Sequence, residues 1–133
     1  MKILALAFWI FCGLQITYSQ TKQYVESASS CDTMLARFDD VHSVAMQDQN
    51  KDSFVIIVAH PGRGEKSIRY NQQRLRALET YLSNTRGLPK ERLVLTVGKR
   101  RTGLAKIEFY VSGKLVNELF FRKGQRVCTW CCA

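Results

Sequence analysis

In two stretches of the chain, mostly apolar residues recur every three or four positions, which is the period of an amphipathic helix. The first stretch lies between Cys31 and Gln47, and its stripe is Met34, Leu35, Phe38, Val41, Val44 and Ala45. The second begins after Ser67, which offers an N-cap oxygen, and its face is Ile68, Asn71, Leu75, Leu78 and Leu82. Residues 84–89 close this second helix, with Gly87 available as a left-handed cap.

Four other stretches have the character of strands. Residues 53–59 (SFVIIVA) are continuously apolar and rich in β-branched side chains, which is typical of a central strand covered on both faces. Residues 92–97 and 106–111 follow, and Ser112-Gly113 predicts a hairpin turn into residues 114–121. This order predicts an α/β (α+β) two-layer sandwich, with two helices packed on a mixed sheet of about four strands.

The N-terminal residues predict export. Residues 1–19 combine one lysine, the short apolar stretch ILALAFWIF and small residues before Gln20, as in a secretory signal peptide. The apolar stretch is shorter than the roughly 20 residues that a membrane-spanning helix needs. We therefore expect a signal peptide at 1–19, a linker at 20–30 and a single domain at 31–133. The protein is then periplasmic or extracellular, with no transmembrane segment after cleavage.

Export affects the interpretation of the cysteines, because disulfides persist in oxidising compartments. A bond between the adjacent Cys131 and Cys132 would be strained, which favours a bond from Cys31 to the C-terminal cluster, with Cys128 as one candidate. The cluster also contains a C-x-x-C pattern, but no helix follows it to stabilise a redox thiolate. The two histidines lack the spacing of zinc ligands. We therefore expect a structural disulfide, and no metal or cofactor.

The charge of the chain favours anionic partners. It has 20 basic and 11 acidic residues, with basic clusters at 99–101 (KRR) and 122–126 (RKGQR). Outside the cell such charge attracts anionic glycans, lipid head groups and nucleic acid, although a solvated basic surface is the alternative. The aromatic residues near these clusters alternate along predicted strands, so we expect them in the core or on a sheet face rather than stacked on bases. No specific nucleic-acid partner is expected.

The sequence HPGRGEKS, which follows the predicted central strand, contains incomplete catalytic patterns. It resembles a phosphate-binding loop, but the required G-x-x-x-x-G-K-[ST] is absent because Glu65 separates Gly64 from Lys66. His60 and Ser67 have neither a G-x-S-x-G elbow nor an acidic partner pattern around them. We therefore expect a protein that is not an enzyme.

Several positions together match a known family. They are Tyr70, Asn71, Arg74, Leu75, Leu78, Tyr81 and Leu82 in the second helix, Gly87-Leu88-Pro89 after it, and Lys106-Ile107-Glu108 in a later strand. On these residues the chain resembles the OmpA-like, peptidoglycan-associated domain, in which a buried strand leads through a polar loop into such a helix. The resemblance covers about half of the chain beyond the signal peptide and implies the same two-layer fold.

The resemblance also implies a ligand site. In the family, the helix arginine and an aspartate at the end of the preceding strand grip the diaminopimelate group of peptidoglycan. Arg74 matches that arginine, but His60-Pro61-Gly62 stands where the aspartate is expected, and the nearby carboxylate is Glu65. Either Glu65 substitutes for the aspartate, or the site is lost and only the scaffold remains. The candidate ligand-binding residues are His60, Arg63, Glu65, Lys66, Asn71 and Arg74.

Two functions follow from these features. The first is an exported, non-catalytic binding module of the cell envelope, whose partner is a cell-wall glycopeptide such as peptidoglycan or another anionic envelope polymer. The alternative is a secreted structural or protein-partner-binding domain that has lost the glycan site. For Arg74, the corresponding alternative is a solvated charge or a weak surface pair with Glu65 or Glu79.

Overall fold

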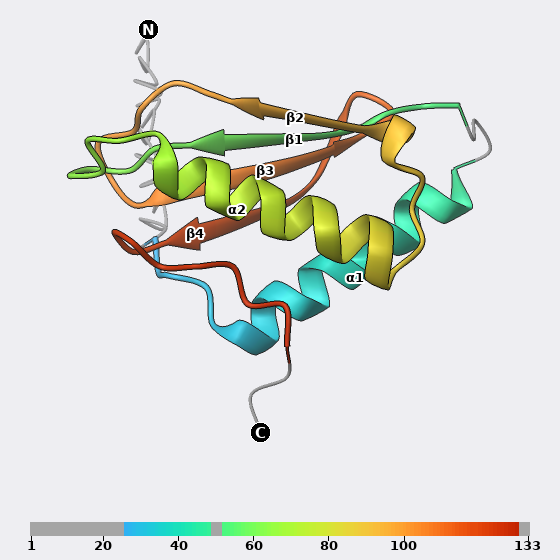
Figure 1. The fold of residues 1–133 in the computed structure, drawn as a ribbon, viewed down its shortest axis with the longest axis horizontal. Helices are drawn as coiled ribbons and strands as arrows, with labels where there is room; N and C mark the ends of the chain where they lie inside the picture. The colour runs from blue at the N-terminus through green and yellow to red at the C-terminus, as the bar shows by residue number, and fades with distance from the viewer. Residues whose placement is uncertain (1–25, 49–51, 131–133) are drawn as a thin grey trace, which may run out of the picture.

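The computed structural model describes residues 26–48 and 52–130. Within this part of the chain, two α-helices lie on one face of a four-stranded mixed sheet and form a two-layer sandwich (Figure 1). The elements are α1 (Cys31–Gln47), β1 (Val55–His60), α2 (Arg69–Thr80), β2 (Leu93–Val97), β3 (Ala105–Val111) and β4 (Lys114–Phe121). The predicted fold class and order of elements are confirmed. The predicted signal peptide and most of the predicted linker lie outside the described residues.

The sheet has the strand order β2-β1-β3-β4, so β1 is central as predicted. β1 pairs parallel to β2 and antiparallel to β3, and β4 is antiparallel to β3. The strands β1, β2 and β4 therefore point to the same end of the sheet (Figure 1). The hairpin turn is also as predicted, since Ser112 and Gly113 both have positive φ, which suits the twist of a tight hairpin.

The prediction that β1 is covered on both faces is wrong. Its buried residues alternate with half-buried ones, because the helices cover only one face of the sheet. Ile57 is fully enclosed beneath the helices, whereas Ile56 and Val58 lie on the opposite face. On that face Ile56 is opposite Tyr110 and Val58 is opposite Glu108, so neighbouring side chains partly shield them. A continuous apolar run therefore does not require a second covering layer.

The helices begin and end close to the predicted positions. Ser30 caps α1, where its hydroxyl oxygen accepts the Thr33 N–H at 3.2 Å. α2 begins at Arg69 with Ile68 at its N-cap, so the prediction of Ser67 as the N-cap is wrong, although the Ser67 hydroxyl accepts the Arg69 N–H at 3.1 Å. A π-helical turn, Tyr81–Thr85, continues α2 and leads to Gly87, where φ is +76° as the predicted left-handed cap requires. Neither helix in the described ranges has both the length and the apolar character needed to cross a membrane.

The core lies between the helices and the covered face of the sheet. Phe38 of α1 is at its centre, with ring centroids 5.5 Å from Tyr81 and 6.0 Å from Phe109. The predicted stripe of α1 is confirmed at four of its positions, namely Met34, Phe38, Val41 and Ala45. In α2 the prediction for Ile68 is wrong, because its side chain is half exposed and Arg74 lies on the buried face instead.

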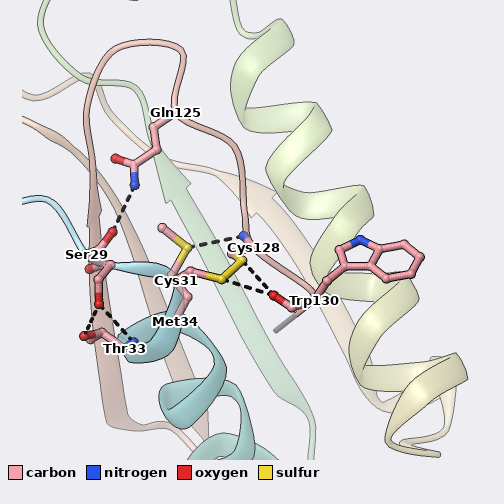
Figure 2. Close-up of a disulfide and its surroundings, with 8 residues drawn as sticks. Ser29, Cys31, Thr33, Met34, Gln125, Cys128 and Trp130 are labelled. Atoms are coloured by element: carbon pink, nitrogen blue, oxygen red, sulfur yellow. Dashed lines mark hydrogen bonds between the residues drawn. A yellow bond between two sulfur atoms is a disulfide. The ribbon is translucent and has the colours of Figure 1, made fainter. Parts of the chain in front are cut away.

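A disulfide joins the two ends of the domain. It links Cys31, the first residue of α1, to Cys128 in the segment after β4, which is the candidate pair (Figure 2). Before α1, residues 26–30 lie along β4, where the Ser29 N–H donates to the Phe120 carbonyl at 2.8 Å. Cys131 and Cys132 lie outside the described residues. The N-terminal segment is thus fixed to β4, and the disulfide fixes the segment after β4 to the start of α1.

Candidate anion-binding site

The loop after β1 is packed against a neighbouring loop. The Arg63 N–H donates to the Gly103 carbonyl, and the Arg101 N–H donates to the Pro61 carbonyl, both at 2.8 Å. Gly62 is required for this approach, because a Cβ at that position would lie 2.3 Å from the Ala105 backbone nitrogen. Segment 61–68 is therefore held against segment 98–104, which connects β2 to β3.

A buried ion pair connects this loop to α2. Arg74 and Glu65 are each only 1% exposed. Nη2 of Arg74 lies 2.6 Å from Oε1 of Glu65, and Nη1 lies 3.0 Å from Oε2. This parallel, two-bond arrangement is the strongest geometry available to a guanidinium and a carboxylate. Arg74 therefore faces the glycine-containing loop, as the resemblance implies, but an intrachain carboxylate is already bound to it.

The remaining donors of Arg74 are also used within the chain. Nη1 donates to Oδ1 of Asn71 at 2.9 Å, Nη2 to the Arg122 carbonyl at 3.3 Å, and Nε to the Gln125 carbonyl at 3.0 Å. With the two bonds to Glu65, these account for all five N–H groups of the guanidinium. The guanidinium also lies 4.9 Å from the centroid of the Phe121 ring. In this arrangement Arg74 has no donor left for an external ligand.

Glu65 is similarly surrounded by donors. Besides Arg74, its carboxylate accepts the Gly62 N–H at 3.2 Å and the Gly124 N–H at 3.3 Å. Burial alone would raise the pKa of this carboxyl, but the bonds from Arg74 and the two backbone N–H groups outweigh burial and lower the pKa. Glu65 therefore stays ionised, and it joins the segments that follow β1 and β4.

The structure divides the predicted ligand-binding residues into three groups. Glu65, Asn71 and Arg74 form the buried cluster, while Arg63 and Lys66 are exposed on the loop. His60 is separate, because its position in β1 places it on the sheet face opposite the helices. Its ring nitrogens lie 3.0 Å from the Lys99 carbonyl and 3.0 Å from Oε2 of Glu108. The six residues therefore do not form one open site.

Basic residues gather at the same end of the sheet. Nine basic residues lie in three segments, 61–69, 98–104 and 122–126, which together contain one acidic residue, Glu65. These segments follow β1, β2 and β4, so they leave the sheet at the same end (Figure 1). We call this surface the basic end. The two sequence clusters at 99–101 and 122–126 indicated its charge, but their placement beside the loop after β1 required the sheet topology.

Two of the nine basic side chains bond to other residues of the protein, and the other seven can contact a ligand. Arg100 donates to the carbonyls of Gly62, Glu65 and Lys66, and Arg101 pairs with Glu26. The other seven form no ion pair within the described residues. They are all exposed and comprise Arg63, Lys66, Arg69, Lys99, Arg122, Lys123 and Arg126. The basic end can therefore attract an anion without first breaking an internal salt bridge.

Comparison of the chain with protein-family models, with curated proteins and with solved structures finds no match.

Proposed function

We propose that this protein is an exported, non-catalytic binding module, distantly related to the OmpA-like domains, whose basic end binds an anionic polymer of the cell envelope. The observation that supports this most is the set of seven exposed cations in the three segments of the basic end, none of which forms an ion pair within the described residues. Cations gathered on one surface sum to a potential that concentrates a polyanion there. The N-terminus of α2 opens into the same surface, and its dipole adds to the positive potential.

The packing of the loops suits such a role. Buried bonds from Arg74 and Glu65 fix the segments after β1 and β4, and Arg100 fixes the segment after β2. Because the loops are fixed before binding, less conformational entropy is lost when a polymer docks. In this proposal the buried pair holds the binding surface together, and the exposed cations make the contacts.

A second candidate function is a structural or protein-partner-binding domain that has lost a glycan site. The pairing of Arg74 with Glu65 favours it, because an internal carboxylate occupies the guanidinium that a ligand carboxylate would need. Both proposals treat Arg74 as structural. They differ in whether an anionic envelope polymer binds the exposed cations.

Sedimentation with purified peptidoglycan, and with a second anionic wall polymer, separates the two functions. In low salt, the first proposal expects the protein to be retained on at least one polymer and released by high salt. The variant Lys66→Glu with Lys123→Glu should lose most of its retention, because it reverses two exposed charges of the basic end.

A matched control reverses two exposed lysines elsewhere. Lys90 and Lys114 are both exposed, and neither belongs to the segments of the basic end. Lys90→Glu with Lys114→Glu changes the net charge equally and should keep most of the retention. Absence of retention on every polymer at low salt would favour the second function. Equal losses in both variants would show attraction by total charge, with no role for the basic end.

A further inference from the structure

Two adjoining hollows run along α2, and the first of them begins at the basic end, because Arg126 lines it. One has a volume of about 270 Å³ and is lined by Tyr70, Gln73 and Arg126 among others, and the next has about 560 Å³. They share Ala77, whose small side chain lies between them on α2. On α2 the lining residues Tyr70, Gln73, Ala77 and Thr80 follow helical spacing, so they lie on one helix face. Segment 125–130 forms the opposite wall.

Trp130 lies at the far end of this groove. Its side chain belongs to the lining of the larger hollow, yet the residue is 81% exposed, the most exposed large hydrophobic in the described part of the chain. Figure 2 shows the indole projecting from the chain beside the disulfide. The Trp130 carbonyl oxygen lies 3.2 Å from Sγ of Cys31 and 3.1 Å from Sγ of Cys128. The backbone that carries this indole is therefore placed next to a covalent crosslink.

The polar lining of the groove is neutral or positive. Gln73, Thr80, Thr85 and Thr129 offer amide and hydroxyl groups, which both donate and accept hydrogen bonds. Arg76 and Arg126 add two exposed guanidinium groups, and no acidic side chain lines either hollow within the described residues. Guanidinium groups bind carboxylates in a planar, two-bond geometry. The groove thus combines groups for hydroxyls, groups for carboxylates and one exposed flat aromatic face.

We infer that the ligand of this protein is an acidic glycan that lies along the groove between α2 and segment 125–130, with one sugar ring stacked on Trp130. This inference rests on the proposed function and names the polymer class. A pyranose ring presents both an apolar C–H face and many hydroxyls, so it matches the indole and the threonine and glutamine side chains together. Its carboxylates match Arg76 and Arg126, and the polymer continues onto the basic end past Tyr70.

An acidic polypeptide matches the charges of this surface, but it has no ring for the indole and few hydroxyls. A single-stranded nucleic acid has rings for stacking, but its anionic groups are phosphates. Three probes of equal charge separate these classes, namely an oligomannuronate, an oligoglutamate and an oligothymidylate. Calorimetric titration of the intact secreted protein with each probe, at one low salt concentration, gives the three affinities.

The inference expects the oligomannuronate to bind more tightly than the oligoglutamate by up to about tenfold, because one ring stacked on the indole contributes up to about that factor. Trp130→Ala should remove this preference, while the affinity for oligoglutamate stays unchanged. Trp130→Tyr should restore part of the preference. Phe54→Ala is the control. Phe54 is also exposed, at 54%, but it immediately precedes β1 and lines neither hollow. It should bind all three probes as the wild type does.

Three outcomes would overturn the inference. Equal affinity for oligomannuronate and oligoglutamate would mean that charge alone is recognised, and the proposed function would stand without a glycan. Tightest binding of oligothymidylate, lost in Trp130→Ala, would mean that the groove stacks bases. An unchanged glycan preference in Trp130→Ala would show that the indole does not contact the glycan. Failure of every probe to bind at low salt would instead contradict the proposed function itself.

Discussion

Arg74 is almost completely enclosed although its guanidinium is always charged. Such burial is tolerated because each of its five N–H groups meets an acceptor and Glu65 supplies the opposite charge. The resemblance implied that Arg74 faces the loop after β1, and the sequence left a solvated charge or a weak surface pair as the alternative. Its burial was not predictable, because the covering residues, Arg122 to Gln125, follow β4 and lie some 50 positions away.

Removing one partner of this pair should be costly. For Glu65→Gln we expect the free energy of unfolding to fall by about 3 kcal/mol, because a buried cation then lacks its counter-charge. Urea denaturation at neutral pH measures this loss. Asp39→Asn is the comparison, since the Arg86–Asp39 pair is 38% and 49% exposed and should contribute under about 1 kcal/mol. Equal losses in the two variants would contradict the account of Arg74 as a buried anchor.

A second carboxylate gives a prediction for pH. Burial would raise the pKa of Glu108, but Lys106, His60 and Tyr110 surround the carboxylate and lower its pKa to about 2. A lowered pKa stabilises the fold above the unfolded pKa, and this stability is lost as the pH falls towards the folded value. At pH 7 the free energy of unfolding of the wild type should exceed that of Glu108→Gln by about 3 kcal/mol.

This advantage should shrink as the pH falls from about 4.5 towards 2, because protonation of Glu108 then removes the same interaction. Denaturation midpoints of the two proteins across this range measure the gap. A gap that stays constant down to pH 2 would show that Glu108 does not keep its charge through these partners.

Among the elements, the strands and helices were predictable because each depends on local periodicity. The hairpin at Ser112-Gly113 and the cap at Gly87 depend on φ preferences of single residues, and both form as expected. The extent of covering on β1 was not predictable, because an apolar run looks the same whether one or two layers cover it. The packing of the loop after β1 against β3 also escaped prediction, since it depends on the strand order.

That packing predicts different costs for two glycine substitutions. Gly62→Ala should lower the free energy of unfolding by about 2 kcal/mol or more, because the new methyl group meets the Ala105 backbone. Gly87→Ala meets no atom within 4 Å and should cost only about 1 kcal/mol, for its positive φ. Chemical denaturation of both variants tests the order. A smaller loss for Gly62→Ala would contradict the close contact of the loop after β1 with the start of β3.

The disulfide gives the second prediction at this scale. Cys31 and Cys128 are 97 positions apart, and closing a loop of this length stabilises the fold by up to about 5 kcal/mol in the chain-entropy treatment. Cys31→Ser should lower the melting temperature clearly, whereas Cys131→Ser should leave it near the wild-type value. If Cys131→Ser costs as much as Cys31→Ser, then Cys128 is not the partner of Cys31.

At the scale of the whole molecule, the three basic segments come together only through the topology. The sequence showed that charge clusters at 99–101 and 122–126, and it separately marked Arg63 and Lys66 after the central strand. It did not show that all of them lie at one end, because this requires β1, β2 and β4 to point the same way. The resemblance implied that Arg74 contacts a ligand, but Arg74 is buried. The exposed cations around it form the surface that a ligand can reach.

The salt dependence of polyanion binding tests the role of the basic end most directly. A polyanion that contacts several cations releases counterions, so the logarithm of its affinity falls linearly with the logarithm of salt concentration. We predict that Lys66→Gln with Lys123→Gln reduces the steepness of this line by up to about 2, roughly one for each lost contact. Lys90→Gln with Lys114→Gln should leave the slope of the wild type unchanged. Equal slopes for all three proteins would contradict the claim that the basic end is the binding surface.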